Sequence, residues 1–292
     1  RSFFFFFSLG FIGTGVMGHS MAGHLMNAGY TVHIYNRTKS KAQDLIDQGA
    51  IWEENPAALA PHCDIIFTIV GFPQDVEATY LGESGLLAHS KKGTILVDMT
   101  TSSPTLAKRI ATEGEKIGIE VLDAPVSGGE LGAKEARLSI MIGGNAEAFK
   151  KVLPLFEIMG KQITHMGKAG NGQYTKMSNQ IAIASNMMGV CEALTYGEKS
   201  GLDPTRLLQA IGAGSAGSSS MLNLAPRMIK EDYTPTFYIK HFIKDLKIAI
   251  ESAKEMNLEL PSLNRACSMY EELAKNGFEN EGTQALIRWY KD

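Results

Sequence analysis

The sequence predicts an α/β domain with a largely parallel sheet in residues 1–168, followed by an all-α domain in residues 169–292. Three observations predict this division. In the first half, short apolar runs alternate with amphipathic helical stretches, which is the pattern of βαβ units. After about Gly167 only helical periodicity remains. One long helical segment follows Gly170, and we expect it to join the two domains.

The elements expected in the first domain follow one another in regular order. Strands are expected in the runs LGFIG, YTVHIYN, CDIIFTIV, GTILVDM, IEVLDAPV and LSIMIGG. Helices are expected in VMGHSMAGHLMNAG, KSKAQDLIDQG, VEATYLGESGLLA and PTLAKRIATEGEKIG. Glycine stands where three of these helices would end, at Gly29, Gly49 and Gly118, as it commonly does after a helix C-terminus.

An apolar run, Phe3–Phe7, precedes the first expected strand at Ser8–Ile12. No small-residue cleavage site follows this run, so we do not interpret it as a signal peptide. It is far too short to cross a bilayer. We interpret it as an extension of unassigned role.

The second domain is expected to contain helices and the loops that connect them. The helical runs are YTKMSNQIAIASNMMGVCEALTYGEKSG, PTRLLQAIGA, FIKDLKIAIESAKEMN and LNRACSMYEELAKNG. The glycine- and serine-rich segment Gly212–Ser220 is predicted to be a loop between two of these helices.

The composition is that of an ordinary globular protein, with 44% hydrophobic and 20% charged residues among 292. A net charge of -3 and a pI near 6.2 provide no basic surface for nucleic acid. Three cysteines (Cys63, Cys191 and Cys267) lie far apart and in no metal-binding spacing. We therefore expect no metal site, no membrane partner and a cytoplasmic location.

The first predicted turn carries the pattern Gly13-x-Gly15-x-x-Gly18, directly after a strand and at the start of a helix. In that context Gly13 permits the tight turn, Gly15 lets the backbone approach a pyrophosphate, and Gly18 lets the helix pack on the strand. The pattern alone is weak evidence. Because strand, glycines, helix and second strand arrive in the right order, it predicts a Rossmann-type dinucleotide site.

The second strand ends in YNRTKSK, where an NAD site usually has Asp or Glu to accept hydrogen bonds from the ribose 2′-hydroxyl. This chain has Asn36, Arg37, Thr38 and Lys39 there. An arginine cannot accept a hydrogen bond, but it can bind a 2′-phosphate. The alternative is that Arg37 is a solvated loop residue. The local chemistry favours NADP(H) over NAD(H).

A second glycine-containing segment, DAPVSGG, spans Asp123–Gly129. Ser127, Gly128 and Gly129 could present a hydroxyl and bare backbone N–H groups to a small carboxylate. The alternative is an ordinary turn, because Pro, Ser and Gly are all turn residues.

The segment GKAGNGQYTKMSNQ places one lysine at the start of the long helix. Helical spacing puts Lys176, Asn179, Gln180 and Ile183 on one face. Partial burial would lower the pKa of this lysine, which could then act as a general acid. The alternative is a structural salt bridge across the domain boundary, and this segment alone does not decide between them.

These motifs occur in the order and spacing of the β-hydroxyacid dehydrogenase family, which the chain resembles from about Leu9 to the last helix. The segments that carry the resemblance are GFIGTGVMG, DAPVSGG, GKAGNGQYTKMSNQ and FYIKHFIKDLKIA. The family includes 3-hydroxyisobutyrate dehydrogenase, tartronate semialdehyde reductase and the glyoxylate/succinic semialdehyde reductases. The resemblance implies hydride transfer between a nicotinamide cofactor and a small β-hydroxy acid or semialdehyde carboxylate, in a homodimer or homotetramer.

The resemblance also implies roles for individual residues. Lys176 matches the catalytic lysine, acting as general acid or base, and Asn179 matches the amide that orients the substrate beside it. The implied substrate contacts are Ser127, Gly128, Gly129, Phe237 and Asp245. The implied cofactor contacts are Gly13, Thr14, Gly15, Val16, Met17, Gly18, Asn36, Arg37, Thr38, Val70, Thr101 and Lys244.

Three other readings share part of this pattern. Decarboxylating 6-phosphogluconate dehydrogenases are much longer and have a histidine in the lysine motif, where this chain has Ser178, Asn179 and Gln180. Imine reductases typically lack the lysine. A non-catalytic NADP-binding sensor would keep the glycines and lose the catalytic set. His241 stands where many relatives have an apolar residue, and we do not assign it to the site.

Overall fold

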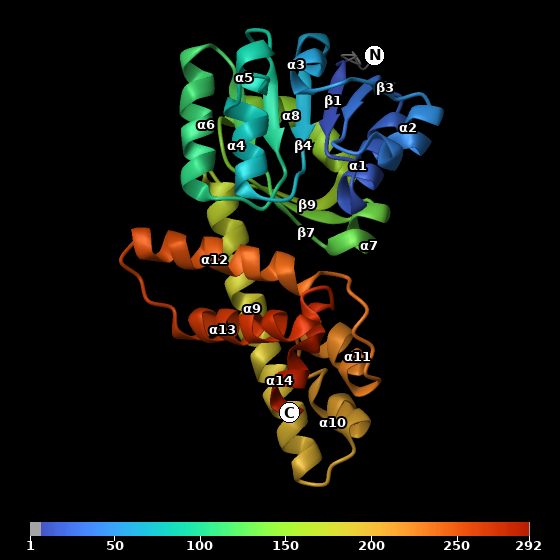
Figure 1. The fold of residues 1–292 in the computed structure, drawn as a ribbon, viewed down its shortest axis with the longest axis vertical. Coiled ribbons are helices and arrows are strands. Elements are labelled where there is room, and N and C mark those ends of the chain that lie inside the picture. The colour runs from blue at the N-terminus through green and yellow to red at the C-terminus, as the bar shows by residue number, and fades with distance from the viewer. Residues whose placement is uncertain (1–6, 292) are drawn as a thin grey trace. The chain divides into compact units, whose positions relative to one another are not determined.

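The computed structural model describes residues 7–291. They form two compact units that divide within one long helix, after Lys176 (Figure 1). Of the predicted extension Phe3–Phe7, all but Phe7 lies outside the described residues. The prediction of an α/β domain followed by an all-helical one is confirmed.

The first unit is built on a six-stranded parallel sheet with strand order β3-β2-β1-β4-β5-β6. The strands are β1 (Leu9–Ile12), β2 (Val32–Tyr35), β3 (Ile51–Trp52), β4 (Ile65–Thr68), β5 (Ile95–Asp98) and β6 (Glu120–Asp123). The order reverses between β1 and β4, and in open α/β sheets ligands bind beside the carboxyl ends of strands at such a point.

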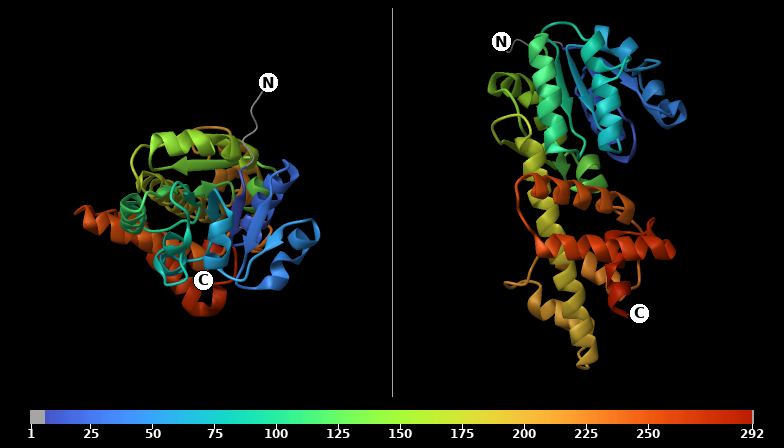
Figure 2. Two further views of the ribbon diagram at one scale, coloured as in Figure 1. Left: turned by 90° about the horizontal axis from the view of Figure 1, so that it is seen from above. Right: turned by 60° about the vertical axis from the view of Figure 1, so that its left-hand side comes forward.

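Helices cover both faces of this sheet (Figure 2). Successive residues of a strand point to opposite faces. Phe67 of β4 accordingly packs in one core with residues of α1 and α8, whereas Ile66 packs in the other with residues of α3 to α6. The helices are α1 (Val16–Asn27), η1 (Lys39–Ala42), α2 (Gln43–Asp47), α3 (Pro56–Leu59), η2 (Ala60–His62), α4 (Pro73–Leu81), α5 (Leu86–His89), α6 (Pro104–Lys116) and α8 (Ala146–Met159).

A separate three-stranded sheet follows, in the order β7-β8-β9. It comprises β7 (Val126–Ser127), β8 (Leu138–Ile142) and β9 (Gly160–His165), with α7 (Gly129–Lys134) after β7. The run IEVLDAPV, expected as one strand, is divided between β6 and β7 around Pro125, whose ring removes a backbone donor. β7 pairs antiparallel with β8, so this sheet is mixed.

Some helices begin where a side chain accepts a hydrogen bond from one of their first backbone N–H groups. The hydroxyl of Ser103 accepts a hydrogen bond from the N–H of Leu106 at the start of α6. The carboxylate of Asp203 accepts one from the N–H of Arg206 at the start of α10 (Pro204–Ile211). Proline follows both caps at the first helical position, where its missing N–H costs no hydrogen bond.

The second unit is helical and contains its own apolar core. Its elements are most of α9 (Asn171–Lys199), then α10 (Pro204–Ile211), η3 (Ser220–Leu224), α11 (Ala225–Ile229), α12 (Ile239–Glu255), α13 (Pro261–Leu273), η4 (Ala274–Phe278), η5 (Thr283–Leu286) and α14 (Ile287–Lys291). Residues spaced three and four apart on α9, among them Met187, Val190 and Leu194, are buried in that core. The predicted loop Gly212–Ser220 leads from α10 into a π-helical turn.

Candidate active site

The turn between β1 and α1 carries the three glycines of the predicted cofactor motif. Gly13 has a positive φ of 94°, and a Cβ atom there would collide with the carbonyl oxygen of Ile69. A Cβ atom at Gly18 would collide with the carbonyl oxygen of Gly13. At Gly15, by contrast, a Cβ atom would meet nothing within 4 Å. Two glycines therefore close the turn, and the third leaves open space at the start of α1.

Residues around this turn fix the loop after β2. The side-chain oxygen of Asn36 accepts a hydrogen bond from the N–H of Thr14 (3.0 Å), and its amide donates to the carbonyl of Thr38 (2.9 Å). Within residues 7–291, the buried hydroxyl of Thr14 has no hydrogen-bond partner. Val16 is 61% exposed at the first position of α1. This turn has the backbone shape and an unused polar group suited to a pyrophosphate.

Positive charge lies on the loop after β2. The Arg37 side chain is 88% exposed and its guanidinium lies 3.7 Å from the carboxylate of Asp75. The Lys39 ammonium lies 5.0 Å from the ring centroid of Trp52. Sequence reasoning named Lys39 in this loop but not Trp52, because the contact between them joins the loop to β3 and has no local signal.

Beside this turn, a buried polar network supports the loops that follow β4 and β5. The hydroxyl of Thr68 donates to the carboxylate of Asp98 (3.2 Å) and contacts the hydroxyl of Tyr80 (2.7 Å). Asp98 also accepts from the N–H of Thr100 (3.0 Å), whose own hydroxyl accepts from the N–H of Val70 (2.9 Å). The predicted cofactor residues Val70 and Thr101 thus lie on loops that this network ties together.

Burial is the main influence on the Asp98 carboxyl group and raises its pKa to about 7. Hydrogen bonds from Thr100 and Thr68 act in the opposite direction, because they favour the charged form. Since Thr68 uses its proton toward Asp98, we assign Tyr80 as the donor to Thr68. Sequence reasoning missed this network, whose members lie on three separate elements.

The residues predicted to bind a substrate carboxylate, Ser127–Gly129, lie at the end of β7 and the start of α7. Ser127 is the last residue of this strand, and Gly128 and Gly129 lead into α7. Both glycines have positive φ, 129° and 62°, and both are exposed. Both glycines are accessible at the surface, and their contact with a substrate carboxylate stays a prediction.

Lys176 lies in the second turn of α9, and only 7% of its surface is exposed to solvent. The first turn of the helix is held by side chains of other elements. The Asp123 carboxylate accepts hydrogen bonds from the N–H groups of Gly170 (2.7 Å) and Gln173 (2.9 Å). Gln173 accepts one from the N–H of Ser102 through its side-chain oxygen (2.9 Å). Sequence reasoning proposed no role for Asp123 or Gln173.

The other predicted residues belong to the second unit. The Asn179 amide donates to the side-chain oxygen of Gln180 (2.8 Å), and Gln180 donates to the carboxylate of Asp245 (2.7 Å). The Lys244 ammonium lies 3.0 Å from the same carboxylate. These four residues form one connected polar chain. Phe237 contacts Phe242 edge to face (5.6 Å between centroids) beside the helical core.

His241 lies on the same helix as Lys244. Burial is the main cause that lowers its pKa, and the charges of Lys244 and Lys240 lower it further. Its ring lies 5.6 Å from that of Tyr238. A lowered pKa favours the neutral ring, and the omission of His241 from the site stays a prediction.

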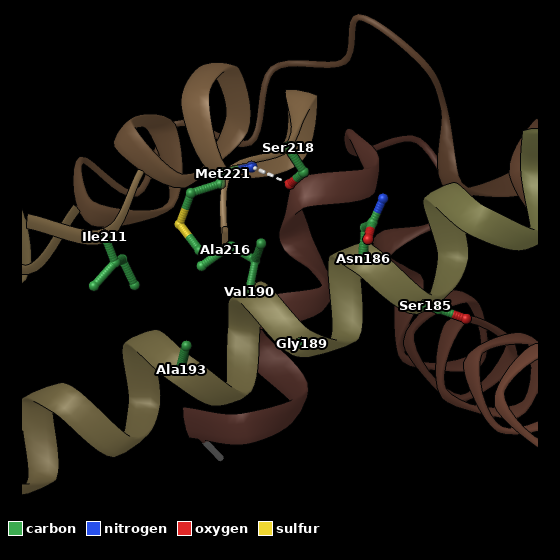
Figure 3. Close-up of a pocket in the computed structure, with 9 residues that line it drawn as sticks. All are labelled: Ser185, Asn186, Gly189, Val190, Ala193, Ile211, Ala216, Ser218 and Met221. Carbon is green, nitrogen blue, oxygen red and sulfur yellow. Dashed lines mark hydrogen bonds between the residues drawn. The ribbon is translucent and has the colours of Figure 1, made fainter. Parts of the chain in front are cut away.

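A pocket of about 270 Å³ lies within the second unit (Figure 3). Polar and apolar residues of α9 and of the segment from α10 to η3 line it: Ser185, Asn186, Gly189, Val190, Ala193, Ile211, Ala216, Ser218 and Met221. None of them is a predicted site residue. Over residues 7–291, no cluster of His, Cys, Asp and Glu is arranged to hold a metal ion, and no helix is long and apolar enough to span a membrane.

Two family models together cover this architecture. Residues 8–167 match the NAD binding domain of 6-phosphogluconate dehydrogenase. Residues 170–290 match the NAD-binding domain of NADP-dependent 3-hydroxyisobutyrate dehydrogenase. The chain belongs to the 3-hydroxyisobutyrate dehydrogenase family. The recognition made from the four sequence motifs is thus confirmed, and the protein is an NAD(P)-dependent oxidoreductase.

Named members of the 3-hydroxyisobutyrate dehydrogenase family and related reductases are similar over almost the whole chain. A probable 3-hydroxyisobutyrate dehydrogenase-like 1 protein, mitochondrial, of Arabidopsis thaliana is 49% identical, over 96% of this chain and 84% of that protein. The 2-hydroxy-3-oxopropionate reductase of Escherichia coli (strain K12) is 41% identical, over 96% of each chain. A structure of Mycobacterium tuberculosis 3-hydroxyisobutyrate dehydrogenase with L-serine has a TM-score of 0.91 and 27% identity, covering 98% of this chain and 99% of that one.

Proposed function

We propose that this dehydrogenase interconverts a small β-hydroxy acid and the corresponding semialdehyde carboxylate, with Lys176 as general acid and base. The observation that carries the proposal is the burial of Lys176 beside a fixed helix start, in a chain whose other segments supply a cofactor turn and an exposed Ser-Gly-Gly loop. The L-serine in the Mycobacterium tuberculosis structure is itself a small hydroxy acid, which supports the substrate class.

The turn after β1 fits a dinucleotide. Its open space at Gly15 and the unused hydroxyl of Thr14 suit the pyrophosphate, next to the positive end of α1. When bound, the nicotinamide cofactor supplies or accepts the hydride. Val70 and Thr101, on loops tied to the Asp98 network, would border the nicotinamide end, and Lys244 would also contact the cofactor.

The remaining chemistry belongs to side chains of this protein. In the direction of reduction, the Lys176 ammonium gives a proton to the substrate oxygen as negative charge develops on it, and in oxidation the amine takes the proton back. The positive charge also stabilises the developing alkoxide. Asn179 fixes that oxygen. Ser127, Gly128 and Gly129 hold the carboxylate, while Asp245 and Phe237 complete the substrate contacts.

We infer that NADP(H) is preferred over NAD(H). Residues 36–38 offer no carboxylate for a ribose 2′-hydroxyl, and the exposed Arg37 guanidinium suits a 2′-phosphate. Lys39, two residues further along, adds a positive charge, and its ammonium lies 5.0 Å from the ring centroid of Trp52. One of the two matching family models describes an NADP-dependent enzyme, which supports the same preference.

We also propose a homodimer or homotetramer, because the second unit exposes large apolar side chains. Leu222 is 60% exposed next to the pocket residue Met221, and Tyr196 is 77% exposed on α9. Large apolar groups at a surface commonly mark contacts between copies of a chain. Light scattering of the purified protein gives the assembly mass directly.

The proposal is tested by following NADPH oxidation with glyoxylate, succinic semialdehyde, tartronate semialdehyde and methylmalonate semialdehyde, with NADH in parallel. Turnover of one of these compounds is expected. Lys176→Ala should lower kcat by about 10²- to 10⁴-fold, the usual contribution of a general acid, without preventing NADPH binding. Unchanged turnover in Lys176→Ala would show that another group transfers the proton. Preferred turnover with NADH would overturn the assignment of Arg37.

A further inference from the structure

The carboxylate of Asp123 caps α9, which begins at Asn171, far along the chain from β6. Asp123 is the last residue of β6, and only 4% of it is exposed. Its Oδ1 atom accepts from the N–H of Gly170 and its Oδ2 atom from the N–H of Gln173. The first N–H groups of a helix have no partner within the helix, and the helix dipole favours a negative charge beside them. Asp123 meets both needs at the start of α9.

The backbone is shaped to bring this carboxylate close to the helix. A Cβ atom at Gly172 would meet the carboxylate of Asp123 at 2.9 Å and would also collide with the carbonyl oxygens of Asp123 and Met141. A Cβ atom at Gly143 would lie 2.7 Å from the carboxylate. Side chains at these two positions would therefore force Asp123 and the helix apart.

Gln173 ties the same helical turn to the loop that follows β5. It is fully buried. Its side-chain oxygen accepts from the N–H of Ser102 (2.9 Å), and its amide donates to the carbonyl of Thr100 (2.7 Å). The intervening residue, Thr101, is a proposed cofactor contact. A single buried amide thus joins the start of α9 to the loop expected to border the nicotinamide.

Lys176 follows Gln173 by three residues, nearly one helical turn. Any rotation or slide of the first turn therefore moves the lysine. We propose that Asp123 and Gln173 are positioning residues that hold the first turn of α9 in place and so set where the Lys176 ammonium stands. This inference rests on the proposed role of Lys176 as general acid and base.

A carboxylate is suited to this task in a way that an amide is not. Asp123 presents two acceptor oxygens to two backbone donors, whereas Asn would present one oxygen and one NH₂ group. The NH₂ group would face a backbone N–H, and both would lose a partner. Burial raises the pKa of Asp123, and the N–H groups of Gly170 and Gln173 act in the opposite direction.

A double-mutant cycle tests the positioning role, with kcat and NADPH affinity measured for Asp123→Asn, Lys176→Ala and the double variant. We expect Asp123→Asn to lower kcat about 100-fold when Lys176 is present, the cost of a misplaced catalytic group. It should lower the residual kcat less than about threefold in Lys176→Ala, because there is no lysine left to misplace. The Kd of NADPH, from fluorescence titration, should change less than about threefold. Equal losses in both backgrounds would overturn the inference, as would a kcat loss explained by weakened NADPH binding.

Gln173→Ala provides a second cycle that keeps the backbone bonds to Asp123 and removes only the ties to Thr100 and Ser102. We expect a loss of about tenfold in kcat that again disappears in the Lys176→Ala background. Asn171→Ala is the matched control in the same turn, because its side chain donates to the carbonyl of Met166 and to no proposed site loop. It should change kcat less than about twofold.

These outcomes distinguish a failure of the proposed function from a failure of the positioning role. Full turnover in Lys176→Ala removes the proposed function itself. A large loss of kcat in Lys176→Ala, with additive losses for Asp123→Asn and Gln173→Ala, keeps the proposed function and removes the positioning role. If circular dichroism shows that Asp123→Asn does not fold, the Gln173→Ala cycle decides the question.

Discussion

In the first unit the buried Asp123 carboxylate is held by backbone N–H groups, whereas in the second the buried Asp245 carboxylate is held by the side chains of Gln180 and Lys244. The contrast extends beyond these two residues. The cofactor turn depends on close approach of backbone atoms at its glycines. The polar chain of the second unit depends on hydrogen bonds and an ion pair between side chains. We expect the first arrangement to fail when a single methyl group is added, and the second to fail when a charge is removed.

The largest effect is expected for Gly18→Ala, which tests the sensitivity of the first unit to added atoms. The new methyl group would collide with the carbonyl of Gly13, so we expect a loss of NADPH binding of more than about 100-fold and a lower Tm. Gly15→Ala should weaken NADPH binding without lowering Tm, since its Cβ atom meets no protein atom within 4 Å.

Gly23→Ala is the matched control for that experiment, because it lies on the same helix with only Leu45 nearby, at 3.9 Å. Alanine is the better helix former, so this variant should be more stable by about 0.5–1 kcal/mol. Titration of NADPH fluorescence and thermal melts measure both quantities. Equal binding by Gly18→Ala and Gly23→Ala would contradict the importance of backbone contacts at this turn.

The second largest effect tests the other side of the comparison, the charge in the helical unit. Asp245→Asn removes the carboxylate that lies 3.0 Å from the Lys244 ammonium, where both side chains are largely buried. Breaking a buried ion pair leaves an uncompensated charge, and we expect a loss of about 3 kcal/mol in the free energy of unfolding. Urea denaturation measures it.

Glu271→Gln is the control for Asp245→Asn. It breaks the ion pair between Lys247 and Glu271, which is just as short but exposed to solvent. Exposed pairs contribute at most about 1 kcal/mol. Similar losses in the two variants would show that burial does not increase the contribution of the Lys244–Asp245 pair to the free energy of unfolding.

A pH experiment sharpens the comparison, because Asp98 in the first unit is held partly by side-chain hydroxyls. Its pKa is raised from an ordinary 3.8 to about 7 in the folded chain. As the pH rises, the Asp98 carboxyl group therefore loses its proton at a lower pH in the unfolded chain than in the folded one. The Asp98 contribution to stability should therefore fall between about pH 4 and pH 7, by a few kcal/mol. Asp98→Asn should remove that slope, and the difference in Tm between variant and wild type should grow in favour of the variant across this window.

Asp47→Asn, at an exposed position on α2, is the control for the pH experiment. It should follow the wild-type dependence throughout. A parallel dependence for Asp98→Asn as well would mean that the Asp98 carboxyl group titrates alike in the folded and unfolded chain.

The smallest effect is expected at Arg37. Its exposed side chain belongs neither to the glycine turn of the first unit nor to the buried polar chain of the second. Arg37→Ala should weaken NADPH binding about tenfold, the contribution of one charge-assisted hydrogen bond to phosphate, and leave NADH binding unchanged. Lys41→Ala, exposed in the adjacent η1, controls for general loss of positive charge. Equal weakening of NADPH and NADH would show that Arg37 does not read the 2′-phosphate.

The same comparison explains how much could be predicted from the sequence. Backbone requirements leave local signals, so the turn at Gly13–Gly18 and the helix that carries Lys176 were both foreseen. Partnerships between distant side chains leave none. Gln173 contacts Thr100, 73 residues away, and Gln180 contacts Asp245, 65 residues away, so neither contact is visible in any short window. Tyr80 and Thr68 were missed for the same reason, since each reads as an ordinary core residue until the fold brings them to Asp98.

The segment Asp123–Gly129 makes two different kinds of contact within seven residues. Its first residue secures the start of α9, and its last three are the proposed grip on the substrate carboxylate. Loss of the Asp123 carboxylate would disturb the start of α9, and side chains added at Gly128 or Gly129 would strain a backbone of positive φ, so neither end of this short segment tolerates change freely.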